Sequence, residues 1–233
     1  MPELSNMLLD SLSASDAASI APLLKPVHLK SKQVLFTAGN TIKAVYFPTG
    51  AIVSLVIGLA SGSTVEAAMV GRDGVVGASS ALDGRISLSS AVVQLEGSSL
   101  MCEVGALRGT ALQSHTFLST LIRHEQTLFA QAQQSTACMA NHEVGERLCR
   151  WLLRARDLCG SDTLNFTQEF IAEMLGVRRT SVTLAAKTLQ EAGLIKYNRG
   201  QIQILDLAGL QESTCECYEA VKHHYALLIG PRQ

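Results

Sequence analysis

One segment constrains the fold of this chain more than any other, the sequence TQEFIAEMLGVRRTSVTLAAKTL at residues 167–189. Thr167 is a good N-cap, because its hydroxyl can accept a hydrogen bond from the free amides of a first helical turn. The apolar residues that follow have the spacing of a short helix with one buried stripe; they are Phe170, Ile171, Met174 and Leu175. Gly176 then suits a tight turn, which can require a positive φ that other residues resist.

A second helical pattern follows this turn and begins with two arginines and two hydroxyl residues. Its expected buried positions are Val182, Ala185, Ala186 and Leu189. Two helices joined by a short turn that contains Gly form the unit that places its second helix in the major groove of DNA. Arginine and hydroxyl side chains near the start of that helix can reach guanine edges and phosphates. From this pattern alone, the alternative is an ordinary helical hairpin in an enzyme.

The sequence after the second helix favours the DNA-binding interpretation. Residues 195–205, IKYNRGQIQIL, alternate apolar and polar positions on both sides of Asn-Arg-Gly, which predicts a short β-hairpin. A helix-turn-helix followed by such a hairpin is a winged helix. Between Arg178 and Gly200 there are five basic residues and one acidic residue, although the whole chain has a net charge of −1. Positive charge is therefore concentrated where phosphate contacts are expected. The residues predicted to contact DNA are Arg178, Arg179, Thr180, Ser181, Thr183, Lys187, Thr167, Gln168, Lys196 and Arg199.

Composition limits the class of protein. The chain has 233 residues, 47% of them hydrophobic, which is enough for one large domain or two small ones. No apolar run reaches the roughly 18 residues that a membrane helix needs, and the N-terminus lacks the pattern of a secretory signal. The six cysteines form no CxxC pair, so we expect reduced thiols in a cytoplasmic protein.

Residues 34–104 have a different character from the C-terminal part. Short β-type runs are separated by glycines there: VLF, VYF, AIVSLVI, TVEAAMV, AVVQLE and LMCEV. Many short strands with turn signals every ~8–12 residues predict an antiparallel barrel or jelly roll. The expected fold class is therefore α+β, with an N-terminal jelly roll at residues 1–110 and a C-terminal winged helix at 142–209, followed by a helical tail at 210–233.

Residues 112–141 contain no Gly or Pro and predict one long helix between these domains. A heptad-like seam runs along it, formed by Leu118, Leu121, Glu125, Leu128, Ala132, Ser135 and Met139. We expect this seam to be the interface of a homodimer, because a winged helix on a palindromic site also demands a twofold axis. A second stripe is expected to pack on the β domain: Phe117, Leu121, Ile122, Phe129 and Ala132. Residues 142–158 predict a further amphipathic helix that leads into the winged helix.

Taken together, these segments resemble the CRP/FNR superfamily, the cyclic-AMP receptor protein and its relatives. The resemblance covers roughly residues 12–207 and rests on VLFTAGNTIKAVYFPTGAIVSLVI, the long helix, GERLCRWLL and TQEFIAEMLGVRRTSVTLAAKTLQEAGLI. It implies a cyclic-nucleotide-binding-like domain, a homodimeric transcription factor that binds double-stranded DNA, and RNA polymerase as a further partner. The alternative is a regulatory module that acts through a protein partner. No nucleophile lies in an elbow or beside a matched base, so we expect no enzyme.

The same resemblance argues against cyclic AMP as the effector. Relatives that bind it place a Glu after a Gly in the phosphate-binding segment and an Arg-Ser or Arg-Thr pair soon after. Here that segment reads GRDGVVGASSALDGRISLSSAVV, with Ala78 at the Glu position and Ser89-Ser90 at the position of the pair. Burying a phosphate without a cation is costly, and Arg85 is displaced by four residues. The effector is unknown, and its candidate pocket consists of Val76, Gly77, Ala78, Ser79, Arg85, Ser89, Ser90 and Gln133.

We expect no cofactor and no metal site. The iron–sulfur branch of the superfamily uses an N-terminal cysteine cluster, whereas the first cysteine here is Cys102. Cys215 and Cys217, with His223 and His224, are placed on a C-terminal helix, where ligands two residues apart point to different faces. The thiols of Cys138, Cys149 and Cys159 are expected to act as small buried hydrophobes in helix packing.

Overall fold

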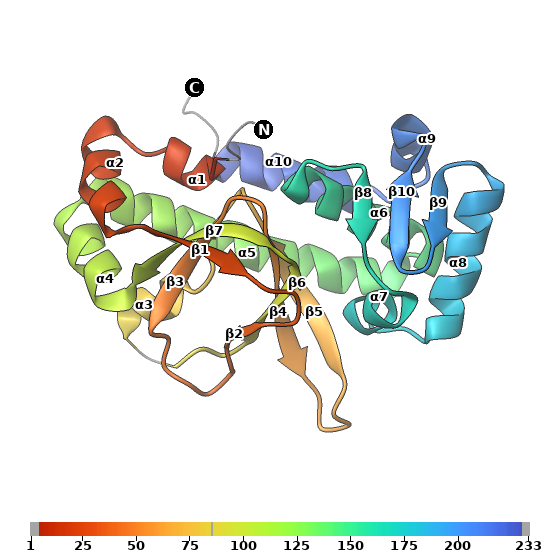
Figure 1. The fold of residues 1–233 in the computed structure, drawn as a ribbon, viewed down its shortest axis with the longest axis horizontal. Helices are drawn as coiled ribbons and strands as arrows, with labels where there is room; N and C mark the ends of the chain where they lie inside the picture. Colours follow the sequence, from red (N-terminus) through yellow and green to blue (C-terminus); the bar gives the residue numbers. More distant parts are fainter. Residues whose placement is uncertain (1–4, 85, 230–233) are drawn as a thin grey trace.

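Two antiparallel sheets form the N-terminal domain of the computed structural model, which describes residues 5–84 and 86–229 (Figure 1). One sheet has the strand order β1-β7-β3 and the other has the order β2-β6-β4-β5. The strands are β1 (Lys25–Leu29), β2 (Val34–Phe36), β3 (Ala44–Pro48), β4 (Ile52–Gly58), β5 (Thr64–Val70), β6 (Ser90–Leu95) and β7 (Gly97–Glu103). The six β runs recognised in the sequence all form strands, and the α+β class with antiparallel sheets is confirmed. Strand β1 was not expected, because KPVHL has only a weak apolar pattern.

Short helices cover the ends of the sheets. They are α1 (Met7–Asp10), α2 (Ala14–Ile20), the 3-10 turn η1 (Ala21–Leu23), α3 (Ala78–Asp83) and α4 (Val104–Gln113). The predicted long helix is α5 (His115–Asn141), which begins after a break, and only Leu112 and Gln113 of the predicted range belong to the end of α4. Ser114 makes this break, because its backbone is extended and its hydroxyl accepts a hydrogen bond from the Phe117 amide.

Helix α5 buries one stripe against the rest of its own chain. The stripe consists of Phe117, Thr120, Leu121, His124, Thr127, Leu128, Gln131, Ser135 and Cys138. Three residues of the predicted dimer seam, Leu121, Leu128 and Ser135, therefore belong to the interior of a single chain. Conversely, Ile122 and Phe129 were expected to pack on the β domain but are 50% and 65% exposed. The stripe that this chain buries is thus shifted around α5 relative to the one expected to pack on the β domain.

Helix α10 (Cys217–Ile229) explains this shift. It lies along α5 in Figure 1 and covers the C-terminal half of the buried stripe. Tyr218, Val221 and Tyr225 of α10 are all buried. Periodicity alone does not distinguish a C-terminal helix of the same chain from a second subunit as the cover of this face.

Helix α6 (Val144–Cys159) connects α5 to the C-terminal domain and packs against both domains. The Trp151 indole nitrogen donates a hydrogen bond to Glu66 Oε1 at 3.1 Å. Arg154 forms an ion pair of 2.5 Å with Asp73 and lies over the ring of Tyr225. The C-terminal domain is thereby fixed to the edge of the sheet that contains β5.

The C-terminal domain has the elements of a winged helix, at the right of Figure 1. In chain order they are β8 (Thr163–Asn165), α7 (Gln168–Leu175), α8 (Arg179–Glu191), β9 (Ile195–Asn198), β10 (Gln201–Ile204) and α9 (Leu207–Glu212). Strand β8 was not expected; it joins the hairpin to give the sheet order β8-β10-β9. None of the helices within residues 5–84 and 86–229 is long and apolar enough to cross a membrane.

A fully buried histidine joins α5 to the β domain. His124 Nε2 accepts a hydrogen bond from the Val75 amide at 3.2 Å. The backbone approaches so closely that a Cβ on Gly74 would lie 2.1 Å from the same nitrogen. Burial is the main cause that lowers the pKa of His124 to about 4, because a low-dielectric interior disfavours the charged imidazolium.

We predict that this histidine makes the protein less stable in mild acid. Between about pH 6.5 and pH 4 the unfolded chain binds a proton at His124 and the folded chain does not, so stability falls as the pH falls. From pH 7 to pH 5 the loss is on the order of 2 kcal/mol. Urea unfolding at both pH values should show that His124→Gln loses less free energy of unfolding between pH 7 and pH 5 than the wild type does. The matched variant His115→Gln, at an exposed position of the same helix, should behave as wild type; an unchanged loss in His124→Gln would contradict the prediction.

Candidate nucleic-acid interface

The helix-turn-helix forms as its sequence predicts. The Thr167 hydroxyl caps α7 by accepting a hydrogen bond from the Phe170 amide. Gly176 ends α7 with φ = 64°, a left-handed conformation that glycine adopts without the strain of a Cβ. Helix α8 then begins at Arg179 after the N-cap residue Arg178. These local features determine the angle between the two helices.

The two sides of α8 differ in polarity. Val182, Ala186 and Leu189 are buried in the core of the domain, while Ala185 is half-buried against it. The opposite side carries most of the predicted contact residues in exposed positions: Arg178, Arg179, Thr180, Thr183 and Lys187. Ser181, also predicted to contact DNA, is half-buried. The helix is thus held by its apolar side and presents its polar side to solvent.

The exposed groups of α8 make only weak contacts within the chain. Arg179 lies 3.7 Å from Glu169, and Lys187 lies 3.6 Å from Glu191. Both pairs are more than 60% exposed, and such surface pairs contribute little to stability. Thr183 donates to Gln168 Oε1 at 2.7 Å, which holds this half-buried side chain of α7 beside the exposed face of α8. The two basic side chains remain free to move toward an anionic ligand.

The wing lies next to the start of α7. Its turn has positive φ angles at Arg199 (47°) and Gly200 (82°), as a two-residue hairpin turn with the twist of its strands requires. A Cβ on Gly200 would lie 3.6 Å from the Thr167 side chain, so the turn and the N-cap of α7 are neighbours. Lys196 and Arg199 are exposed. Tyr197 fixes the hairpin by donating to the Phe166 carbonyl at 2.7 Å.

The predicted effector pocket is partly filled by the protein. Val76 and Ala78 are fully buried, and Phe36 and Ile42 lie 3.1 Å from the position of a Cβ on Gly77. The other members differ: Ser79 and Gln133 are exposed, Ser89 and Ser90 are half-buried, and Arg85 lies outside the described residues. A cavity of about 910 Å³ lies elsewhere, between the N-terminal helices, α5 and α10, and none of the predicted pocket residues lines it.

An acidic side chain lies beside Ser79, one of the residues of the predicted effector pocket. Glu125 of α5 accepts a hydrogen bond from the Ser79 amide, in the first turn of α3, at 3.2 Å. Burial is the main cause that raises the pKa of this carboxyl. Glu125 was predicted to lie in the dimer seam, but the structure directs its carboxylate toward the β domain.

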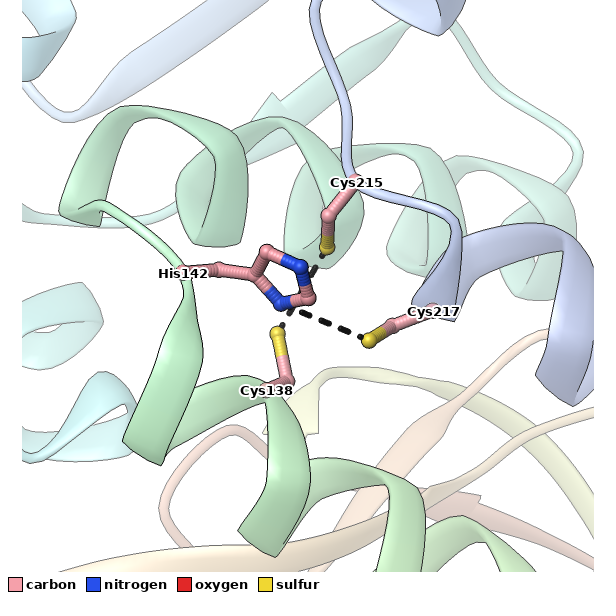
Figure 2. Close-up of side chains that lie close together, drawn as sticks. All are labelled: Cys138, His142, Cys215 and Cys217. Carbon is pink, nitrogen blue, oxygen red and sulfur yellow. Dashed lines mark hydrogen bonds between the residues drawn. The ribbon is translucent and has the colours of Figure 1, made fainter.

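The structure corrects the predicted arrangement of the C-terminal cysteines. Helix α10 begins at Cys217, so Cys215 lies in the connection before it and the two thiols do not sit on opposite faces of one helix. Both approach Cys138 and His142, and the four donor atoms lie within 4.8 Å of one another (Figure 2). His223 and His224 are not part of this group. The expectation of no metal site therefore rested on a wrong helix boundary.

Comparisons with known proteins agree with this architecture. Residues 146–213 match the family model of the Crp-like helix-turn-helix domain. The predicted resemblance to CRP/FNR transcriptional regulators is confirmed. No curated protein matches the sequence, but many solved structures share the fold.

Three of these structures illustrate the similarity. FixK2 from Bradyrhizobium japonicum has a TM-score of 0.70 at 15% identity, covering 82% of this chain and 98% of its own. A CRP-family transcriptional regulator from Thermus thermophilus has a TM-score of 0.67 at 22% identity, covering 80% of this chain and 95% of its own. The c-di-GMP-responsive regulator CLP from Xanthomonas campestris has a TM-score of 0.66 at 13% identity, covering 83% of this chain and 100% of its own. At these identities the likeness concerns the fold.

Proposed function

We propose that this protein is a transcription regulator that binds a palindromic DNA site as a homodimer and is not controlled by cyclic AMP. The observation that carries the proposal is the exposed, polar face of α8, with Arg178 and Arg179 at its start. The Crp-like helix-turn-helix match covers the same residues. A helix of this kind reads base edges in the major groove, while the flanking groups hold the phosphates.

The positions of the polar groups suggest a division of roles. Arg179 occupies the first helical position of α8, from which a long side chain can reach the two acceptors of a guanine. Thr167 and Arg199 lie at the adjoining N-cap and wing turn, where phosphate contacts are expected. Gln168 and Lys196 flank them. Base selection is therefore assigned to α8, and sequence-independent affinity to the groups around it.

The first functional test is the variant Arg179→Ala. It should cost about 1–3 kcal/mol of operator binding and relax the preference at one base pair of each half-site. Site selection from random duplexes, followed by binding titrations, measures both effects.

Two controls separate base reading from general charge loss. Arg199→Ala should weaken binding to all sequences about equally and reduce the salt dependence. Arg108→Ala removes an exposed arginine of α4, in the other domain, and should change neither quantity. An Arg179→Ala protein that selects the wild-type sequence would rule out the assigned role.

The homodimer is best supported on the solvent side of α5. Ile122 and Phe129 are exposed there, seven residues apart, which is the spacing of one heptad. Leu118, Ala132 and Met139 are half-buried beside them. We assign the interface to this face, because the face that contains Leu128 is covered by the chain itself.

Phe129→Asp should therefore convert the dimer to monomers, since two like charges would meet at the twofold axis. Sedimentation velocity gives the mass, and operator titration should show a loss of tight binding. Leu112→Asp introduces the same charge at a leucine of α4 that is 60% exposed. This control variant should remain dimeric. A dimeric Phe129→Asp protein would place the interface elsewhere.

The geometry near α3 supports an effector other than a cyclic nucleotide. The carboxylate of Glu125 already receives the Ser79 amide, at a helix start that would otherwise attract a phosphate. A cyclic phosphate bound there would face this acid and lack an arginine at the Ser89-Ser90 position. A buried phosphate without a charged partner is strongly disfavoured.

Cyclic AMP and cyclic GMP should therefore produce no calorimetric heat and no thermal shift. Operator affinity should be the same with and without either nucleotide, and operator binding itself shows that the protein is intact. A micromolar dissociation constant for either nucleotide would refute this part of the proposal.

A further inference from the structure

Three thiols and one imidazole meet at the junction between the two domains. Cys138 lies in the last turn of α5, His142 directly follows that helix, Cys215 precedes α10 and Cys217 begins it. The three cysteines are buried, at 0%, 4% and 1% exposure, and the His142 side chain is 17% exposed. Figure 2 shows the side chains pointing toward one another from these separate segments.

The distances between the donor atoms fit a single ion. Cys138 Sγ lies 3.6 Å from Cys215 Sγ, and Cys217 Sγ lies 3.6 Å from His142 Nδ1. With a Zn–S bond of about 2.3 Å and a Zn–N bond of about 2.0–2.1 Å, the edges of a tetrahedral site measure about 3.5–3.8 Å. All four donor atoms lie within 4.8 Å of one another. An iron–sulfur cluster, which inserts several irons and sulfides between its thiolates, needs a wider arrangement.

Polar neighbours orient these donors as they do in metal sites. Glu216 Oε2 lies 3.1 Å from His142 Nε2, which leaves Nδ1 as the atom that faces the thiols. Such a carboxylate on the far nitrogen fixes the ring and makes the imidazole a better ligand. The Gln134 amide donates to Cys217 Sγ at 3.0 Å. Packing of small hydrophobic thiols requires neither of these partners.

The surrounding charge also suits a site with three thiolates. Three thiolates and a neutral imidazole around a divalent ion carry a net charge of −1. Arg147 and Arg150 on α6 are close enough to interact electrostatically with the thiols, and Arg147 is only 7% exposed. These cations offset the negative charge of the loaded site.

We propose that Cys138, His142, Cys215 and Cys217 bind one zinc ion per chain. The donor set is Cys₃His, which is typical of structural zinc, and all four tetrahedral positions are filled by protein. The ion joins the end of α5 to the start of α10, and so fixes the junction from which α6 leads into the winged helix. Arg147, which donates to the Leu175 carbonyl at the end of α7, connects this junction to the helix-turn-helix.

The direct test is the metal content of the full-length protein. The protein is purified in a reducing buffer, exposed to trace zinc and then separated from unbound metal. Mass spectrometry should give one zinc per chain in the wild type. Cys215→Ser and His142→Gln should lose most of it, because each removes a ligand. Cys159→Ser is the matched control, because this thiol is buried at the end of α6 and lies outside the site. It should retain one zinc.

Three further measurements test the site even if a cysteine variant folds poorly. Wild-type protein loaded with cobalt(II) should show the intense visible bands of a tetrahedral ion and thiolate charge-transfer absorption. Glu216→Gln, at an exposed position, should fold normally and bind zinc about 10–100-fold more weakly. Zinc should also raise the melting temperature of the wild type and of Cys159→Ser, but not that of Cys215→Ser.

Three results would overturn the proposal. One is wild-type protein that holds no zinc after exposure to it. Another is a zinc content that is equal in Cys215→Ser, His142→Gln and Cys159→Ser, since the metal would then be bound elsewhere. The third is a cobalt spectrum of the wild type without thiolate absorption.

Discussion

The packing of α6 between the two domains is the interaction on which the rest of the structure depends. Its buried face joins Ile52, Val56 and Met69 of the sheet to the interior of the winged helix in one continuous core. Side-chain hydrogen bonds lie at the edge of this core. Burial raises the pKa of Glu66, and hydrogen bonds from Ser54 and Trp151 act in the opposite direction. A carboxyl in this setting is tolerated only because both oxygens have donors.

This arrangement couples the β domain to the proposed DNA-binding surface through packed side chains. Strand β5 contributes Glu66 and Met69, and both contact side chains of α6 or α5. Beyond β5, Asp73 holds Arg154, whose guanidinium also lies over Tyr225 of α10. A displacement of β5 or of the following loop would change the contacts of three helices together. The winged helix is carried by one of these helices, so its orientation is coupled to the β domain by packing and not by a flexible linker.

The parts of the fold that follow from local patterns could be predicted from the sequence. The cap at Thr167, the positive φ at Gly176 and the turn at Arg199-Gly200 each depend on residues within a few positions of one another. The strands followed in the same way from short apolar runs between glycines. Contacts between distant segments could not be predicted. Periodicity located the stripe on α5 but could not say whether α10 or a second chain would cover it.

The cysteine cluster shows the same limit at the level of a site. Cys138 and Cys215 are 77 positions apart, and neither spacing within the cluster matches a familiar zinc motif. If Cys215 and Cys217 shared a helix, their thiols would point to different faces of it. That helix begins two residues after Cys215, and this small difference in the boundary lets both thiols face the end of α5.

The position of α10 has a consequence for the order in which the chain can fold during synthesis. Domains generally form from the N-terminus as the chain emerges from the ribosome. The β sheets, α5 and the winged helix can all form before residues 217–229 are available. Until then the end of α5 that includes Cys138 lacks the cover of α10, whereas Gln131 already bonds to the Met69 backbone of β5. This half of α5 therefore gains its full cover only after residues 217–229 have emerged, and docking of α10 completes that part of the core.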